Sequence, residues 1–361
     1  MKFDFCIGNP PYQEEQKSSD SNGSLKNFAP PVYNYYIDAA IEVAEKVELI
    51  HPARFLFNAG STPKAWNEKM LNDEHFKVLV YEPDSDKVFP DLSTAIKGGI
   101  AITYHDETTM FGAIQAFTQF SEANSITHKV NTRDDFVSFS EIVFSRTSYR
   151  LTEAMHMDFP DVRYHEDESG NNLGRLSKGH DYDMASNIFE RLPMVFHDKR
   201  PSDEYVYIQI LGRLDNKRVY RWIRKDYVND VENLEFFKVL IPQANGTGGF
   251  GETVSEPIVE KPYIGHTETF ISIGKYSSCE EASNTLKYIK TKFTRTLLSV
   301  LKVTQNGNKP VWRMIPLQNF TSESDIDWNK SIPEIDRQLY RKYGLTQEEI
   351  DFIETHVKEM T

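Results

Sequence analysis

The sequence has few cysteines, no long apolar run and no excess of positive charge. Cys6 and Cys279 are the only cysteines among 361 residues, and two distant thiols can form neither a disulfide framework nor a cysteine-based zinc site. The ten histidines show no His-Glu-x-x-His or similar spacing, so we expect no catalytic metal. No apolar run reaches the roughly 18 residues of a membrane span, and the N-terminal residues lack the apolar core of a signal peptide. We therefore expect a cytoplasmic protein without membrane contact.

The charge of the chain is negative overall but uneven along its length. A net charge of −13 argues against a protein that coats nucleic acid indiscriminately. Residues 282–313, however, contain seven basic side chains and no acidic one, which fits phosphate contacts confined to one side of the protein. We expect a helix over residues 282–303 and name four candidate DNA contacts on it: Lys287, Lys290, Lys292 and Arg295. The alternative is an amphipathic helix whose charges merely face water.

The first twelve residues combine an apolar run with a rigid polar corner. Residues 3–7 read as a buried strand, and Asn9-Pro10-Pro11-Tyr12 follows directly after Gly8. The two prolines fix φ, remove two backbone donors and leave carbonyl acceptors at the carboxyl end of the strand, where open α/β sheets bind ligands. The Asn9 oxygen and the Pro10 carbonyl can each accept one N–H of an amino group on a planar substrate, while the Tyr12 ring stacks on its face. Such acceptors would activate an amine whose lone pair is conjugated into a ring.

This corner resembles the catalytic motif of the DNA amino-methyltransferases, specifically the adenine-N6 enzymes of bacterial restriction–modification systems. Residues 51–55 are similar to the strand and turn that follow the corner in that family, and residues 84–90 with Gly98-Gly99 are similar to the segment whose phenylalanine packs against the flipped base. The resemblance implies S-adenosylmethionine as methyl donor, double-stranded DNA as partner, and Phe89 facing Tyr12 across the adenine. The alternative for Phe89 is a core residue beside a proline turn.

One half of the family pattern is missing. Its methyl-donor site needs a strand, a glycine-containing loop and an acidic residue upstream of the corner, yet only eight residues precede Asn9. Three explanations stay open: a fragment or split enzyme whose partner chain carries the donor-binding half, a wrongly assigned start, or a decayed remnant. Without the missing strands we expect an open sheet edge, one exposed apolar face, and poor solubility or an obligate partner.

The fold class that the pattern predicts is α/β. Alternating helices and strands over residues 1–110 indicate a partial doubly wound methyltransferase sheet, Rossmann-like and truncated, with mainly parallel strands. Residues 111–325 are expected to form an α+β target-recognition domain that contains a hairpin across Asp215-Asn216 and a strand over residues 237–242. Residues 326–361 are expected to form a helical tail with a capping box at Thr346 and Glu349.

Three further stretches have more than one interpretation. Residues 18–24 predict a mobile loop, either over the substrate or merely on the surface. The glycine cluster at residues 245–251 lacks the Gly-Lys-Ser/Thr of an ATP loop, and no helix follows it, so a flexible loop near DNA is favoured over a displaced methyl-donor loop. Residues 83–87 superficially resemble part of a magnesium nuclease, but five contiguous residues cannot supply such a site.

The sequence thus predicts the catalytic corner and recognition part of an adenine-N6 DNA methyltransferase. The predicted catalytic residues are Asn9, Pro10 and Tyr12, and the predicted base-stacking residues are Tyr12 and Phe89. Two alternatives are a non-catalytic DNA-binding or specificity subunit and a methyltransferase acting on another amine, such as a glutamine amide. The basic region disfavours the second alternative. The DNA target cannot be read from the sequence.

Overall fold

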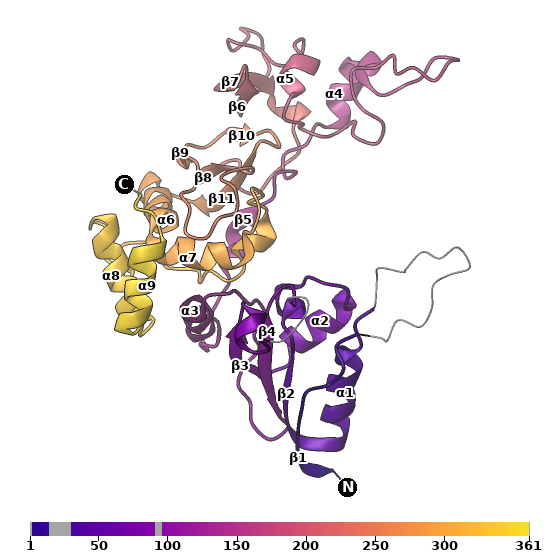
Figure 1. The fold of residues 1–361 in the computed structure, drawn as a ribbon. Coiled ribbons are helices and arrows are strands. Elements are labelled where there is room, and N and C mark those ends of the chain that lie inside the picture. Colours follow the sequence, from indigo (N-terminus) through magenta and orange to yellow (C-terminus); the bar gives the residue numbers. More distant parts are fainter. Residues whose placement is uncertain (1, 14–29, 91–95, 361) are drawn as a thin grey trace. The chain divides into compact units, whose positions relative to one another are not determined.

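The computed structural model describes residues 2–13, 30–90 and 96–360. The chain forms two compact units, Met1–His128 and Lys129–Thr361, whose elements are labelled in Figure 1. The loop predicted at residues 18–24 lies outside the described residues. No helix within these ranges is long and apolar enough to cross a membrane.

The first unit contains a four-stranded mixed sheet. Its strands are β1 (Phe3–Gly8), β2 (Ala44–Pro52), β3 (Phe76–Glu82) and β4 (Ile100–Asp106), in the order β1-β2-β4-β3. Only β1 and β2 are parallel neighbours, whereas β4 is antiparallel to both β2 and β3. The expectation of a mainly parallel sheet was therefore wrong. Parallel strands need a long crossover, usually a helix, and α1 (Tyr33–Val43) joins β1 to β2 in this way. The strand β4 is inserted between β2 and β3, so these two strands, which run in the same direction, are not neighbours.

Two helices cover one face of this sheet. They are α1 and α2 (Lys64–Leu71), which lie on the same side of the strands in Figure 1. Helix α1 ends at Val43, because Ala44 has extended backbone angles and begins β2. The core between helices and sheet consists mainly of large apolar side chains: Tyr33, Ile37, Val47, Leu49, Phe55, Trp66, Met70 and Phe76.

Strand β1 is exposed, contrary to the expectation of a buried strand. It is an edge strand paired only with β2 among the described residues. Phe3, Phe5 and Ile7 alternate on one face and are 71%, 61% and 74% exposed, while Cys6 on the other face packs against the core. Within the described ranges, β1 thus has an open edge and exposed apolar side chains, as the sequence suggested.

Residues 111–117 pack on the first unit. The amide of Phe111 donates to the Glu74 carbonyl, and the Phe117 ring contacts Phe57 and Tyr81. These contacts place the division between the units after residue 128 rather than after residue 110, where the sequence pattern suggested it. The functional roles assigned to the two parts stay predictions.

The second unit holds two smaller sheets. One has the order β10-β6-β7 and the other β5-β11-β8-β9. The predicted hairpin is confirmed: β6 and β7 are joined by Asp215 and Asn216, both with positive φ. The strand predicted at residues 237–242 is also confirmed as β8. The strands are β5 (Val143–Phe144), β6 (Tyr207–Leu214), β7 (Lys217–Arg224), β8 (Phe237–Pro242), β9 (Ile258–Glu260), β10 (Ile264–His266) and β11 (Phe270–Tyr276).

Most longer helices follow the last strand. The single helix expected over residues 282–303 is two helices, because Thr291 is extended and caps the second one through its side chain. The predicted capping box at Thr346 and Glu349 is confirmed. The remaining helices are α3 (Ser121–Asn131), α4 (Glu153–Asp158), α5 (Ile188–Arg191), α6 (Cys279–Lys290), α7 (Lys292–Leu301), α8 (Ile332–Lys342) and α9 (Gln347–His356).

Candidate functional site

The carboxyl ends of three strands meet at one edge of the sheet in the first unit. Strands β1 and β2 are parallel, and β3 runs the same way because both β2 and β3 are antiparallel to β4. Pro52 at the end of β2 and Glu82 at the end of β3 both pair with Ile100, the first residue of β4. The segments that follow β1, β2 and β3 therefore line a single edge, where open α/β sheets bind ligands.

The corner at residues 9–12 lies at this edge, directly after β1. Asn9 is exposed, whereas Pro10 and Tyr12 are half-buried. The backbone carbonyl of Tyr12 accepts a hydrogen bond from the Val32 amide at 3.1 Å, so the corner is tied to the residue before α1. No backbone amide of the described residues donates to the Pro10 carbonyl. The corner thus presents a carboxamide and a carbonyl acceptor on a fixed backbone.

Tyr12 keeps its proton at neutral pH. Burial raises the pKa of its phenol to about 12, and the neighbouring Asn9 side chain offsets part of this rise. The geometry between the two side chains falls short of a hydrogen bond, and the enclosed hydroxyl has no partner among the described residues. A neutral, half-buried phenol ring can stack on a planar substrate and still donate one hydrogen bond.

A buried cluster of aromatic and polar side chains packs beneath the strand ends that carry the corner. The Tyr33 ring stacks on His51 with 5.8 Å between centroids and 3° between planes, and His51 Nε2 lies 2.7 Å from Thr103 Oγ1. Burial lowers the pKa of His51 to about 4, so the imidazole is neutral and structural. The sequence analysis did not predict this cluster. The one signal for it in the sequence is His51, a histidine next to apolar residues at the end of a predicted strand.

Phe89 lies at the same edge, in the turn that follows β3. Its amide donates to the Ser85 carbonyl at 2.8 Å, and the buried Ser85 hydroxyl accepts from the Ile96 amide at 2.9 Å. Gly99 then approaches the end of β3 so closely that a Cβ would lie 2.4 Å from the Glu82 carbonyl oxygen. Among the ring contacts of the described residues, Phe89 and Tyr12 do not touch each other. The two-sided clamp around an adenine stays a prediction.

Arg295 is not a surface residue. It is 1% exposed, and its guanidinium donates to the backbone carbonyls of Lys290, Glu252 and Lys358. Burial lowers its pKa to about 10. The expectation that Arg295 contacts DNA is therefore corrected, because its donors hold α7 to neighbouring segments of the same unit.

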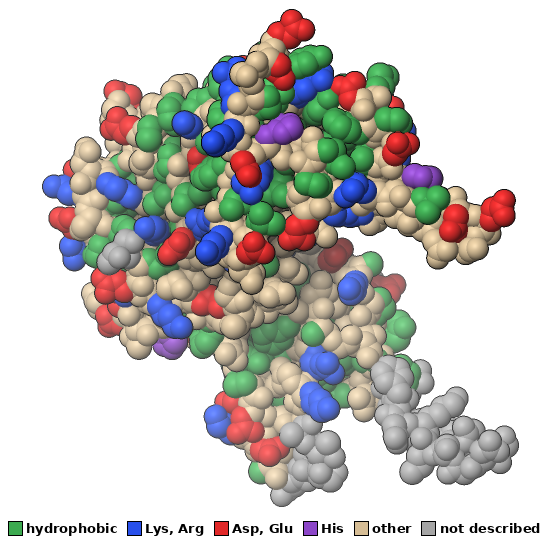
Figure 2. All heavy atoms as spheres, turned by 90° about the horizontal axis from the view of Figure 1, so that it is seen from above, with side chains coloured by type: hydrophobic (Ala, Val, Ile, Leu, Met, Phe, Trp, Pro, Cys, Tyr) green, Lys and Arg blue, Asp and Glu red, His purple; other side chains and the backbone are tan. Residues whose placement is uncertain are grey.

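The lysines of α6 and α7 are also occupied by contacts within the second unit. Lys287 donates to the Trp328 carbonyl at 2.6 Å, and Lys292 forms an ion pair with Glu354 in α9. Lys290 is half-buried and also has a partner. On the face shown in Figure 2, basic and acidic side chains are interspersed. These contacts favour a structural role, and a DNA contact by Lys287, Lys290 or Lys292 stays a prediction.

The glycine cluster at residues 245–251 is held by the carboxylate of the residue that follows it, Glu252. Glu252 accepts hydrogen bonds from the Thr247 and Gly248 amides at 2.8 and 2.9 Å and pairs with Lys302 at 2.7 Å. Burial alone would raise the pKa of Glu252, but Lys302 and the two amides lower it to about 2. The Glu252 carboxylate therefore occupies the place at the loop amides where a phosphate would bind. These contacts favour an ordered loop over the flexible loop that the sequence suggested.

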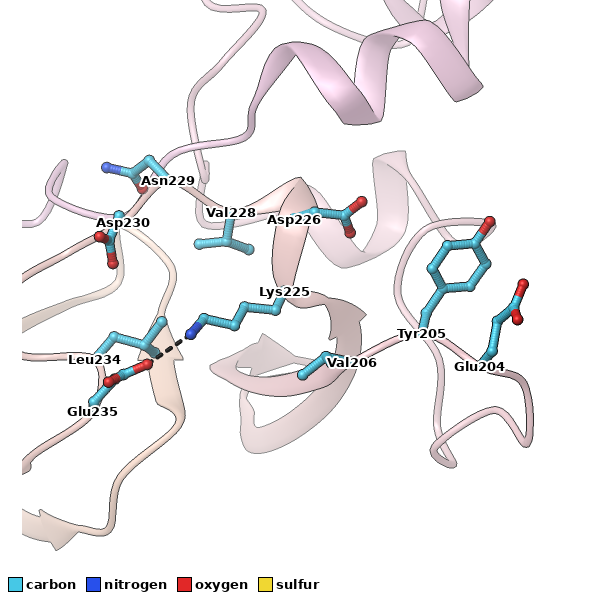
Figure 3. A pocket seen from close by; sticks show the side chains of 10 residues that line it. All are labelled: Glu204, Tyr205, Val206, Lys225, Asp226, Val228, Asn229, Asp230, Leu234 and Glu235. Carbon is cyan, nitrogen blue, oxygen red and sulfur yellow. Dashed lines mark hydrogen bonds and ion pairs between the residues drawn. The ribbon is translucent and has the colours of Figure 1, made fainter.

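An acidic groove in the second unit was not anticipated from the sequence. It has a volume of about 650 Å³ and is shown in Figure 3. Lys225 extends along it and pairs with Glu235 at 2.7 Å. Its lining has four acidic side chains and one basic side chain: Glu204, Asp226, Asp230, Glu235 and Lys225. This charge disfavours a phosphate ligand.

The N-terminal region is similar to known proteins. Residues 1–89 match the model of the Eco57I restriction-modification methylase family. A curated protein of Mycoplasma pneumoniae, described as an uncharacterized adenine-specific methylase, is 34% identical over 101 residues. That match covers 28% of this chain and 22% of the relative, so the chain spans less than a quarter of the relative's length. The family resemblance seen in the sequence is confirmed for this region.

Two solved structures align with most of the chain at low similarity. The type IIG restriction endonuclease BpuSI is 9% identical with a TM-score of 0.30, covering 98% of this chain and 54% of that one. The type IIL restriction-modification enzyme MmeI, solved with DNA, is 10% identical with a TM-score of 0.32, covering 98% and 56%. TM-scores this low do not establish a shared fold.

Proposed function

Because residues 1–89 match a restriction-modification methylase family, we propose that this chain is the catalytic corner and target-recognition part of a site-specific DNA adenine-N6 methyltransferase. The observation that carries the proposal is the corner at residues 9–12, which follows β1 at the edge of the sheet where three carboxyl ends meet. Duplex DNA is the proposed substrate, with the target adenine flipped out of the stack.

The corner residues act on the exocyclic amine of the flipped base. The Asn9 oxygen and the Pro10 carbonyl accept its two hydrogens and draw them out of the plane of the ring, which restores nucleophilic character to the nitrogen. The Tyr12 ring stacks on one face of the base, and Phe89 covers the other. The pKa of about 12 keeps the Tyr12 phenol neutral, so it adds no negative charge beside the base.

The methyl donor requires residues from outside those described here. S-adenosylmethionine would supply an electrophilic methyl group, yet none of the five cavities characterised among the described residues is lined by the corner. The described residues therefore do not fit a complete donor site. We propose that a donor-binding module, encoded outside these 361 residues, completes the enzyme.

Strand β1 is the proposed docking edge for that module. Its outer edge has no partner strand among the described residues, and Phe3, Phe5 and Ile7 present an apolar row beside it. An exposed edge strand with apolar side chains is a ready template for another strand. A strand added there would lie next to Asn9 and bring the module to the catalytic corner.

The test is methyl transfer from labelled S-adenosylmethionine to plasmid DNA, with and without the protein encoded beside this one. We expect incorporation only with the neighbour. Asn9→Ala in the complex should lower incorporation by at least about 100-fold, whereas Asn171→Ala, in an exposed loop of the second unit, should leave it unchanged. An Asn9→Ala complex as active as the wild type would refute the mechanism.

The alternative is a non-catalytic DNA-binding or specificity subunit. The incomplete donor site among the described residues favours it. DNA binding without methylation, both alone and with the neighbour, would support this alternative over the enzyme.

A further inference from the structure

The hairpin of β6 and β7 in the second unit carries an excess of positive charge. Between Tyr207 and Arg224 it carries five cations and one acid, in a chain with a net charge of −13. Its eight directly paired positions run without a register shift from Tyr207 and Arg224 to Leu214 and Lys217. The two turn residues have φ of 50° and 60°, as a tight two-residue hairpin requires. The hairpin, whose strand β6 also pairs with β10, therefore has a regular geometry and an excess of positive charge.

Two of its cations oppose each other directly. Arg213 on β6 is paired with Arg218 on β7, and directly paired residues of antiparallel strands point to the same face about 5 Å apart. Like charges in this arrangement destabilise a hairpin. A bound anion would relieve the repulsion.

The two arginines lack the ion pairs that other cations of the hairpin form. Arg221 pairs with Asp198 and Arg224 pairs with Asp158. No ion pair among the described residues involves Arg213, Lys217 or Arg218. The guanidinium of Arg213 donates to the Asn216 carbonyl at 3.2 Å, and that of Arg218 donates to the Glu256 carbonyl at 2.7 Å, so each keeps further donors.

Both arginines line a hollow of about 470 Å³. Its wall also contains one carboxylate, Glu256, whose backbone carbonyl holds Arg218. Planar guanidinium groups match a phosphate with two parallel hydrogen bonds each. The hollow is lined by Arg213, Asn216, Arg218, Pro242, Ala244, Ser255, Glu256 and Phe270.

We propose that this hairpin face contacts the backbone of duplex DNA, with Arg213 and Arg218 binding phosphates. The inference rests on the proposed function, in which DNA is the substrate. A duplex is favoured over an acidic protein because two neighbouring guanidinium groups match the oxygens of phosphates. This surface is proposed in addition to Lys287, Lys290 and Lys292, whose contacts with DNA stay predictions.

The test is DNA binding by Arg213→Gln, Arg218→Gln and the double variant in the full chain. A labelled duplex is titrated by fluorescence anisotropy between about 50 and 200 mM salt. Each substitution should reduce the slope of log affinity against log salt by about one and weaken binding about tenfold at the lower salt. The matched control is Arg221→Gln, which removes the same charge from the same strand but from the opposite face, where Asp198 already pairs with it.

Three results would overturn the inference. They are slopes equal to that of the control, no DNA binding by the wild-type chain with or without its neighbour, and displacement of the duplex by polyglutamate at equal charge. Methyl transfer by the wild-type complex is measured separately. If transfer persists while both arginine variants bind DNA normally, the hairpin inference fails and the proposed function stands.

Discussion

Replacing Phe5 with threonine separates a docking role for β1 from a role in the stability of the chain. Phe5 is 61% exposed. Its ring contacts the Lys46 ammonium group, whose Nζ lies 5.6 Å from the ring centroid. Threonine keeps the preference for a strand. We therefore expect Phe5→Thr to change the free energy of unfolding of the chain by less than about 1 kcal/mol.

The effect on docking should be larger. A phenylalanine has roughly 200 Å² of surface to bury, and 61% exposure leaves about 120 Å² available for a partner. At about 25 cal/mol per Å² this corresponds to an upper limit of about 3 kcal/mol. The costs of association and ordering reduce the gain, so we expect Kd for the donor-binding module to rise about 10- to 100-fold.

The assay is calorimetric titration of the chain with the neighbouring protein. The control is Tyr35→Gln, which removes a 64% exposed ring from α1 and should leave Kd unchanged. The reasoning is refuted if Phe5→Thr binds the neighbour as tightly as this control does, or if it lowers the unfolding free energy by several kcal/mol.

Three other substitutions test the assignments made from burial and hydrogen bonding. Glu252→Gln should lower the free energy of unfolding by roughly 2 kcal/mol at neutral pH. The folded pKa of Glu252 is depressed from 4.5 to about 2, so wild-type stability should be lost as pH falls from about 4.5 toward 2, and a variant with the same acid unfolding profile would contradict this. Gly99→Ala should destabilise the chain by about 2–4 kcal/mol in urea unfolding, because φ is +77° and the added Cβ meets the Glu82 carbonyl; unchanged stability would disprove the close approach. Arg295→Gln should lower the free energy of unfolding by about 2–4 kcal/mol and leave the salt dependence of DNA binding unaltered. A smaller slope of log affinity against log salt, with unchanged stability, would instead support a DNA contact by Arg295.

Local signals predicted many elements correctly because neighbouring residues determine them. The Asp215-Asn216 turn needs two positive φ angles, which this residue pair tolerates. The capping box at Thr346 and Glu349 satisfies backbone donors within one helical turn. The family resemblance rested on a short contiguous motif and was confirmed over residues 1–89.

Strand direction and side-chain burial could not be predicted from local sequence patterns, because both depend on residues far apart in the chain. The insertion of β4 between β2 and β3, antiparallel to both, depends on pairing partners far along the chain. The apolar run at residues 3–7 was expected to be buried, yet burial depends on whether a neighbouring strand is present. Arg295 and Lys292 looked like surface charges because their partners, Lys358 and Glu354, lie some sixty residues away.

For the corner at residues 9–12, the sequence by itself determined the available chemical groups: a carboxamide, a proline carbonyl and a phenol, in that order after a strand. Tertiary structure decided where that chemistry lies. Pairing in register brings the corner, the end of β2 and the turn before Phe89 to one edge, and it leaves β1 without a second neighbour among the described residues. It also buries Arg295, which the sequence placed among the candidate DNA contacts. The physical reason is that a motif specifies which atoms can react or bind, whereas long-range packing determines which of them remain available.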